Sequence, residues 1–247
     1  MSATAGGRPL ALVAAGAALG AALAVLLLQR RQEGAAASPA AAAAGETGTA
    51  SMPGGGAAEG GRPGAKRPLP PPEVEEEFFS RSQPFFGDEG HQKVRGAYVV
   101  VVGLGGVGSH AAHMLCRAGV ATLRMVDFDQ VSVSSLNRHA VAALADVGRS
   151  KVGVLAEKLG QINPWCNVDA RAVMFTGDKA AELLAADPAT GKAKPDYVVD
   201  AIDDLTTKTE LLKYCAVHDI PVVMAGGAGA KADFTRLCLG NINDAAR

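Results

Sequence analysis

The residues best suited to chemistry follow a short apolar run near the middle of the chain. Tyr98–Val102 is apolar and mostly β-branched, which is typical of a strand buried on both faces of a parallel sheet. Gly103, Gly105 and Gly108 then turn the chain into a helix. Such a turn directs backbone N–H groups and a helix N-terminus at one point, which attracts phosphate. A side chain here would keep phosphates, or the helix, away from the strand. The stretch therefore predicts a nucleotide site.

An acidic residue about 20 positions after such a turn is expected to accept the ribose hydroxyls of a dinucleotide. Asp127 lies 19 residues after Gly108, but it would serve ATP as well as NAD. Arg138 and Lys151 separate the two hypotheses, because a triphosphate attacked at its α-phosphorus moves negative charge that Arg and Lys neutralise. Asp203 supplies a carboxylate where magnesium would bridge phosphates. We therefore expect ATP with magnesium rather than NAD.

The positions of these residues depend on strands and helices that alternate along the chain. Further strands are expected at Thr122–Val126, Val168–Phe175, Tyr197–Ala201 and Pro221–Met224. The expected helices are Val107–Ala118, one capped by Ser150 and stopped by Pro164, Asp178–Ala186 and Leu205–His218, with shorter ones at Glu73–Phe79 and Gly87–Arg95. Val131–Arg138 is expected to be a loop or a short strand. The alternation predicts an α/β fold with a doubly wound, mostly parallel, Rossmann-like sheet that binds its ligand at the carboxyl ends of the strands.

The first part of the chain differs from the rest in composition. Leu10–Leu28 carries no charge and would span about 28 Å as a helix, close to the hydrocarbon thickness of a bilayer. Arginines follow at once, so residues 1–31 predict a transmembrane anchor that leaves the remainder in the cytosol. A cleaved signal peptide and an organelle transit peptide are the alternatives, and both match the sequence less well. Residues 32–72, rich in Ala, Gly and Pro, predict a disordered linker, and residues 73–247 the folded domain.

Charge and cysteine content narrow the function further. The net charge of −1 provides no general basic field, so a nucleic-acid partner would have to bind a local patch. The four cysteines form no CxxC pair, which excludes a zinc knuckle within this sequence and indicates reduced thiols. We predict structural roles for Cys116, Cys215 and Cys238, which lie in apolar segments.

Four motifs, in the order GLGGVGS, DFDQVSVSSLNRH, DVGRSK and DAID, resemble those of the ubiquitin-activating-like adenylyltransferases, the ThiF, MoeB and HesA superfamily. Three further segments, RSQPFFGDEG, SSLNRHAVA and GGAGAKAD, give a closer likeness to the tRNA threonylcarbamoyladenosine dehydratases. The resemblance implies a Rossmann-like homodimer that binds ATP and magnesium and adenylates a carboxylate. In the dehydratases this carboxylate belongs to a threonylcarbamoyl group on a tRNA adenosine beside the anticodon, which then cyclises with loss of water.

The resemblance also implies roles for individual residues. Asp127 would bind the ribose. The catalytic residues would be Arg138 and Lys151, which meet the phosphates, and Asp203, which serves magnesium or the α-phosphate. The nucleotide would be cradled by the glycine loop, which comprises Gly103, Gly105, Gly106 and Gly108.

Two assignments depart from the pattern of the superfamily. Ser135 stands where related proteins often have an asparagine that contacts phosphate, and Asn137 would replace that contact. An arginine upstream of the first strand reaches across the dimer in this superfamily, and Arg81 is the candidate here.

Other functions stay open at this point. Some relatives activate the C-terminus of a ubiquitin-like or sulfur-carrier protein, using a downstream cysteine and often paired CxxC ligands, neither of which is visible before Arg247. A catalytically idle nucleotide-binding adaptor is a third hypothesis, although an idle fold has no need of the two cations and Asp203. Because the superfamily normally continues with further strands, we expect the domain to be C-terminally incomplete. Eukaryotic dehydratases of this type sit on the mitochondrial outer membrane, and the resemblance implies that location for the anchor.

Overall fold

A single sheet organises the structure, a computed structural model that describes residues 11–12, 71–226 and 240–241. The described strands follow the order β4-β3-β2-β5-β6-β1-β7. Neighbouring strands are parallel, except that β1 and β7 are antiparallel. The strands are β1 (Ala11–Leu12), β2 (Tyr98–Val102), β3 (Thr122–Val126), β4 (Asn167–Arg171), β5 (Tyr197–Asp200), β6 (Val222–Met224) and β7 (Gly240–Asn241).

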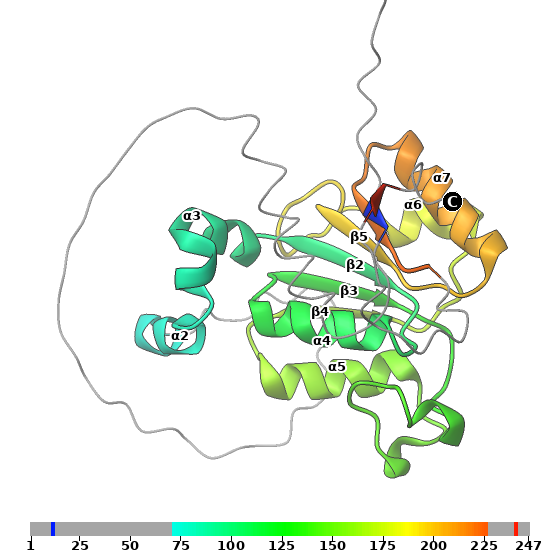
Figure 1. Ribbon diagram of the computed structural model, residues 1–247, viewed down its shortest axis with the longest axis horizontal. Coiled ribbons are helices and arrows are strands. Elements are labelled where there is room, and N and C mark those ends of the chain that lie inside the picture. Colours follow the sequence, from blue (N-terminus) through cyan, green and yellow to red (C-terminus); the bar gives the residue numbers. More distant parts are fainter. Residues whose placement is uncertain (1–10, 13–70, 227–239, 242–247) are drawn as a thin grey trace, which may run out of the picture.

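Helices cover both faces of this sheet (Figure 1). α4 (Gly108–Ala118) and α5 (Lys151–Ile162) pack on one face, and the short α6 (Ala180–Leu183) and α7 (Leu205–Val217) pack on the other. Alternate residues of β2 enter the two hydrophobic cores, so all five of its side chains are buried. The predicted α/β class with a parallel, Rossmann-like sheet is therefore confirmed.

The central strand β2 marks the place where the chain changes direction across the sheet. β3 and β4 extend the sheet on one side of β2, whereas β5 and β6 extend it on the other. Open α/β sheets bind ligands at such a switch point, outside the carboxyl ends of the strands. The glycine loop leaves β2 at this point.

Two helices lie beyond the amino ends of the strands, α2 (Pro72–Phe79) and α3 (Gln83–Arg95) (Figure 1). The buried Phe79 ring, at the end of α2, packs directly on Gly119. A Cβ added at Gly119 would lie 2.6 Å from the ring, so this contact requires glycine. Arg95 stacks over the Phe79 ring at 4.7 Å and binds Glu75 at 2.9 Å. α3 begins at Gln83, four residues before the predicted start at Gly87. Gly87 kinks the helix, because its φ is +68°.

The third strand of the chain's α/β core is shorter than the predicted Val168–Phe175. Among the described strands β4 pairs with β3 alone, and its last pair in the register is Arg171 with Val126, the final residue of β3. Beyond Arg171 no described strand continues the pairing, and the chain leaves the sheet. Phe175 then enters the same hydrophobic core as Leu211 and Cys215 of α7. The segment predicted as loop or strand, Val131–Arg138, contains a 3₁₀ turn at Val133–Ser135.

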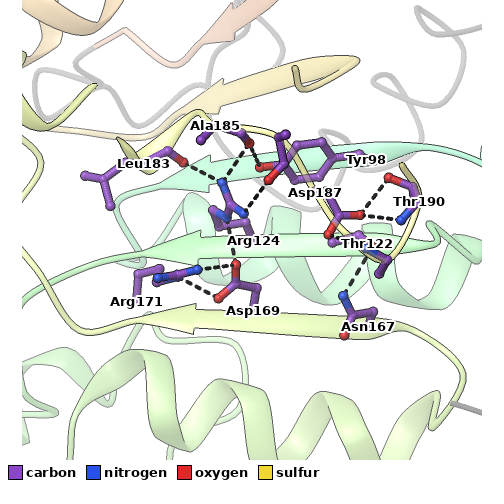
Figure 2. A network of polar contacts seen from close by, with 12 residues as sticks. Tyr98, Thr122, Arg124, Asn167, Asp169, Arg171, Leu183, Ala185, Asp187 and Thr190 are labelled. Atoms are coloured by element: carbon purple, nitrogen blue, oxygen red, sulfur yellow. Dashed lines mark hydrogen bonds and ion pairs between the residues drawn. The ribbon is translucent and has the colours of Figure 1, made fainter. Parts of the chain in front are cut away.

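A buried arginine ends α6 early, at Leu183 instead of the predicted Ala186 (Figure 2). Arg124 of β3 donates to the carbonyl oxygens of Leu183 at 3.1 Å and Ala185 at 3.0 Å, which would otherwise need partners in a continued helix. Its guanidinium also binds Asp169 of β4 at 2.8 Å and lies 5.2 Å from the centre of the Tyr98 ring. Arg124 thus joins three strands to the loop after α6.

No helix among the described residues is long and apolar enough to cross a membrane. The predicted anchor and linker lie outside the described residues, apart from Ala11–Leu12, which pairs with β6, and the last residues of the linker, where α2 begins.

Removal of the Arg124 guanidinium should destabilise the fold strongly. Arg124→Met leaves the Leu183 carbonyl oxygen without its donor, while the Ala185 carbonyl and the half-buried Asp169 carboxylate each lose one of two donors, so the free energy of unfolding should fall by about 3 kcal/mol in urea denaturation. Arg171→Met is the matched control, because Arg171 binds the same Asp169 from a position that is 41% exposed. The control should lose less than about 1 kcal/mol, and equal losses would contradict this account.

Candidate nucleotide-binding site

Three segments meet at the carboxyl ends of the central strands: the glycine loop after β2, the segment after β3 and the turn after β5. Gly103 has a φ of +87°, and a Cβ there would lie 2.7 Å from the carbonyl oxygen of Ala201. A Cβ at Gly108 would lie 1.7 Å from the carbonyl oxygen of Gly103, so only glycine fits at either position. At Gly105 an added Cβ would meet no described atom within 4 Å. The loop is therefore closed toward β5 and open at Gly105.

Asp127, the residue predicted to bind ribose, lies directly against the glycine loop. Its Oδ2 accepts a hydrogen bond from the backbone N–H of Leu104 at 2.5 Å, and its Oδ1 accepts one from the N–H of Asp129 at 2.7 Å. Burial raises the pKa of Asp127, while these two N–H groups and the charge of Lys151 oppose that rise. Each oxygen keeps a second lone pair with which it can accept from a hydroxyl group.

Lys151 is held by a residue to which the sequence analysis gave no role. The Lys151 ammonium lies 2.6 Å from Oδ2 of Asp129, and its backbone N–H donates to the Asp129 carbonyl at 3.0 Å. The side chain is only 10% exposed, so its charge stands at the edge of the site instead of in bulk solvent. The sequence signal for this role of Asp129 is an Asp-x-Asp pattern after a strand, followed by a lysine at the start of a helix.

Arg138 reaches the site by packing against the glycine loop. A Cβ at Gly106 would lie 3.2 Å from Cδ of Arg138, so the arginine stem covers that glycine. Ser109 joins the same two segments, because its hydroxyl donates to the Gly105 carbonyl at 2.6 Å and accepts from the N–H of Ala140 at 3.1 Å. The exposed Arg138 guanidinium donates to the carbonyl oxygen of Ser134 at 2.7 Å. It can exchange this backbone acceptor for an anion.

Ser135 and Asn137, the two positions at which a phosphate contact is expected, differ in their surroundings. The hydroxyl of Ser135 is used within the 3₁₀ turn, because it donates to the Ser132 carbonyl at 2.7 Å and accepts from the Ser132 N–H at 3.0 Å. Asn137 is exposed, and its Oδ1 accepts from Arg138 at 3.3 Å. Of the two, Asn137 has the freer side chain.

Asp203 lies in the turn between β5 and α7, two residues after the Ala201 carbonyl that faces Gly103. Its side chain is exposed, and no hydrogen bond or ion pair to it occurs within the described part of the chain. In that same part, no three His, Cys, Asp or Glu side chains gather into a metal site. A magnesium ion here would therefore need phosphate oxygens and water to complete its ligands, which is how Mg²⁺ commonly binds.

Arg81 is the predicted site residue that the structure does not bring to its own glycine loop. It is exposed in the turn between α2 and α3, beyond the amino ends of the strands (Figure 1). The glycine loop lies at the opposite ends of the same strands. Arg81 therefore lies away from the nucleotide site of its own chain.

Two further buried side chains are structural. His139 accepts at Nδ1 from the N–H of Ala142 at 3.1 Å, which closes the loop that follows Arg138. Burial, together with the charge of Lys151, lowers the pKa of His139 to about 4, so the ring is neutral at pH 7. Burial raises the pKa of Cys215 to about 12, which keeps it a thiol. Cys238 lies outside the described residues.

The fold and this site define a nucleotide-binding protein of the doubly wound α/β class. Residues 79–244 match the ThiF family, and the chain belongs to that family.

Individual relatives are more specific. The chain is 43% identical over 158 residues to tRNA threonylcarbamoyladenosine dehydratase 2 of Saccharomyces cerevisiae. The aligned region covers 64% of this chain and 34% of the yeast protein. It is 36% identical over 165 residues to the Bacillus subtilis tRNA threonylcarbamoyladenosine dehydratase, which covers 67% of this chain and 62% of that protein. The solved structure of the Escherichia coli tRNA N6-threonylcarbamoyladenosine dehydratase in complex with ATP superposes with a TM-score of 0.62 at 36% identity, covering 66% of this chain and 64% of that one. The chain thus spans between about a third and two thirds of these relatives.

Protonation of His139 should weaken the fold at acidic pH. The folded-state pKa of about 4 is below that of an unfolded histidine, so this contribution to the free energy of unfolding is complete above about pH 6.5 and is lost as the pH falls toward 4. Between pH 7.5 and 5.0 the wild type should lose about 2 kcal/mol more than His139→Gln, measured by urea denaturation. Parallel losses in the two proteins would refute the assignment.

Proposed function

We propose that this chain is an ATP-dependent adenylating enzyme that acts on threonylcarbamoyladenosine in tRNA and drives its cyclising dehydration. One observation carries the proposal: the glycine loop, Asp127, Lys151, Arg138 and Asp203 come from four separate segments and converge at the switch point of the sheet. Relatives named as dehydratases of this tRNA nucleoside, one of them solved with ATP, support the choice of nucleotide and substrate.

The arrangement suggests how ATP would lie. The phosphates would approach the open side of the loop at Gly105 and the N-terminus of α4, where N–H groups and the helix dipole favour negative charge. Asp127 would accept from the ribose hydroxyls. Arg138 and Lys151, the first exposed and the second anchored by Asp129, would stand on the side of the loop that faces the segment after β3.

The proposed reaction has two steps. A carboxylate oxygen of the threonylcarbamoyl group attacks the α-phosphorus of ATP, forming an acyl adenylate and releasing pyrophosphate. A nucleophile of the same threonylcarbamoyl group then attacks the activated carbonyl and displaces AMP, which closes the ring. The first transition state places extra negative charge on the α-phosphate and the departing pyrophosphate, and Arg138 and Lys151 would stabilise it.

Asp203 is the residue that would hold magnesium. Its exposed carboxylate, next to the turn that abuts the glycine loop, fits an ion that also binds phosphate oxygens. Such an ion would neutralise phosphate charge during adenylation.

We further propose a homodimer in which Arg81 completes the site of the partner subunit. The support is its distance from its own glycine loop at the opposite ends of the strands, and its exposure.

The proposed placement is membrane-anchored, with the catalytic domain in the cytosol and the mitochondrial outer membrane as the membrane. The apolar composition of Leu10–Leu28 and the arginines after it support this proposal.

The adenylation site can be tested by separating binding from turnover. Arg138→Ala, Lys151→Ala and Asp203→Ala in the full-length protein should each lower kcat for cyclised threonylcarbamoyladenosine by about 10²-fold, the usual loss for one preorganised charge. The Kd for ATP should change much less, because ground-state ATP keeps the glycine loop and Asp127. Turnover is measured by mass spectrometry of the tRNA nucleosides and Kd by calorimetry.

Controls distinguish the rival functions. Arg149→Ala removes an exposed cation that is already paired with Asp146 and Glu157, and it should leave turnover near the wild-type value. Cys215→Ala should do so as well, since the activated carboxyl is attacked from within its own substrate. If NAD raised the melting temperature of the protein as much as ATP does, the result would indicate a dehydrogenase. Adenylation of a carrier-protein C-terminus without any change in tRNA would indicate the carrier-protein function.

The anchor is tested separately. A reporter fused after Arg247 should fractionate with membranes, resist extraction at alkaline pH and be digested by protease added to intact organelles, because residues 1–31 would cross the bilayer once. A variant with two arginines in place of Leu26 and Leu27 is the control and should become soluble. Extraction of the wild-type protein by carbonate, or its protection from protease, would reject the anchor.

A further inference from the structure

A buried ion pair lies directly beneath the turn that carries Asp203. Asp200, the last residue of β5, is 0% exposed, and the Lys208 side chain on the first turns of α7 is 7% exposed. Oδ1 of Asp200 lies 2.8 Å from Nζ of Lys208. Oδ2 of Asp200 is buried, and within the described part of the chain it has no hydrogen-bond partner.

Stability does not explain why two charges are kept here. Asp200 stands beside Val102 and Met224 in the strand register, and both of these neighbours are buried, so the surroundings are apolar. Replacement of a buried ion pair by apolar side chains of similar volume is often neutral or stabilising. Burial raises the pKa of Asp200, and Lys208 opposes that rise. Stability alone is therefore a weak reason for the pair.

The contacts of Asp200 point to the turn after β5. Its Oδ1 accepts from the N–H of Ile202 at 3.0 Å, and its backbone carbonyl accepts from the N–H of Ala225 at 2.8 Å. Between these contacts Ala201 is held with its carbonyl oxygen against Gly103. On the other side of Asp203, Asp204 caps α7 by accepting from the N–H of Thr207 at 2.8 Å.

The consequence is a rigid frame around an exposed residue. Asp200 fixes the turn before Asp203, and Asp204 fixes the start of the helix after it. Lys208, one turn into that helix, binds Asp200 and so connects the two. Removal of the Lys208 contact would free the Asp200 carboxylate to rotate and release the N–H of Ile202. The position of Asp203 relative to the glycine loop would then no longer be set.

We propose that Asp200 and Lys208 are positioning residues for adenylation, and that their ion pair sets the turn on which Asp203 meets the glycine loop. This inference rests on the proposed function. A displacement of about 1 Å in a group that acts on the transition state can cost about 10²-fold in rate, although it changes ground-state binding much less.

The test replaces the pair as a unit, because a single substitution would leave an unpaired buried charge. Asp200→Leu with Lys208→Met is the test variant, and Lys208→Arg, which keeps the charge, is the conservative variant. The matched control is Arg124→Met with Asp169→Leu, a second ion pair, in which the arginine is buried and the carboxylate half-buried; this arginine binds the carbonyls of Leu183 and Ala185 instead of the turn.

Four quantities are measured on each full-length variant: the melting temperature, the Kd for ATP, kcat for tRNA cyclisation, and the magnesium concentration that gives half of the maximal rate. The test variant should lose about 10²-fold in kcat and need several-fold more magnesium, with Kd for ATP within about 3-fold of wild type. Lys208→Arg should recover most of kcat. The control should retain the wild-type kcat and magnesium requirement at any temperature at which it is folded. Losses of kcat that only follow the melting temperature in both double variants would overturn the proposal.

Hydrogen exchange separates this inference from the proposed function. The Ile202 amide should exchange faster in the test variant and at the wild-type rate in the control, whether or not tRNA is the substrate. Unchanged protection of that amide would overturn the inference at any activity. Absence of ATP-dependent cyclisation by the wild-type protein would overturn the proposed function alone.

Discussion

The site depends on one buried carboxylate. Asp127 accepts from the glycine loop through Leu104 and from its own segment through Asp129, and Asp129 in turn binds Lys151. The glycine loop, a ribose acceptor and a cation are thereby connected through charge-assisted hydrogen bonds, which are shorter and stronger than neutral ones. These contacts are made within the chain itself, so they hold the cation near the position expected for the phosphates. Little reorganisation is then left for the reaction itself.

Close packing supplies the other half of this preorganisation. Gly103 and Gly108 bring the loop, the start of α4 and the turn after β5 within van der Waals contact, and Arg138 covers Gly106. These are contacts between backbones or along an aliphatic stem, so they fix position without using any charged group. The charges of the site therefore remain available to a ligand.

Sequence patterns predicted the framework well, because periodicity and glycine spacing report local structure directly. β2, β3 and α5 lie where they were expected, and the class of fold is confirmed. Errors arose where tertiary contacts decide. β4 stops at Arg171 because β3 offers no further partner, and α6 stops at Leu183 because Arg124 takes its carbonyl oxygens. Asp129 and the Asp200–Lys208 pair were missed for the same reason: their roles come from partners at distant positions in the sequence.

The docking of α2 through Phe79 on Gly119 has a genetic consequence. This contact lies beyond the amino ends of the strands, whereas the glycine loop lies beyond the carboxyl ends. A substitution at Gly119 would weaken folding while every group that faces the ligand stays in place, which is the property of a temperature-sensitive allele. Such alleles recover when cells grow in the cold or when chaperones are abundant. A substitution of Lys151 lacks that remedy, because it removes a charge from the site itself.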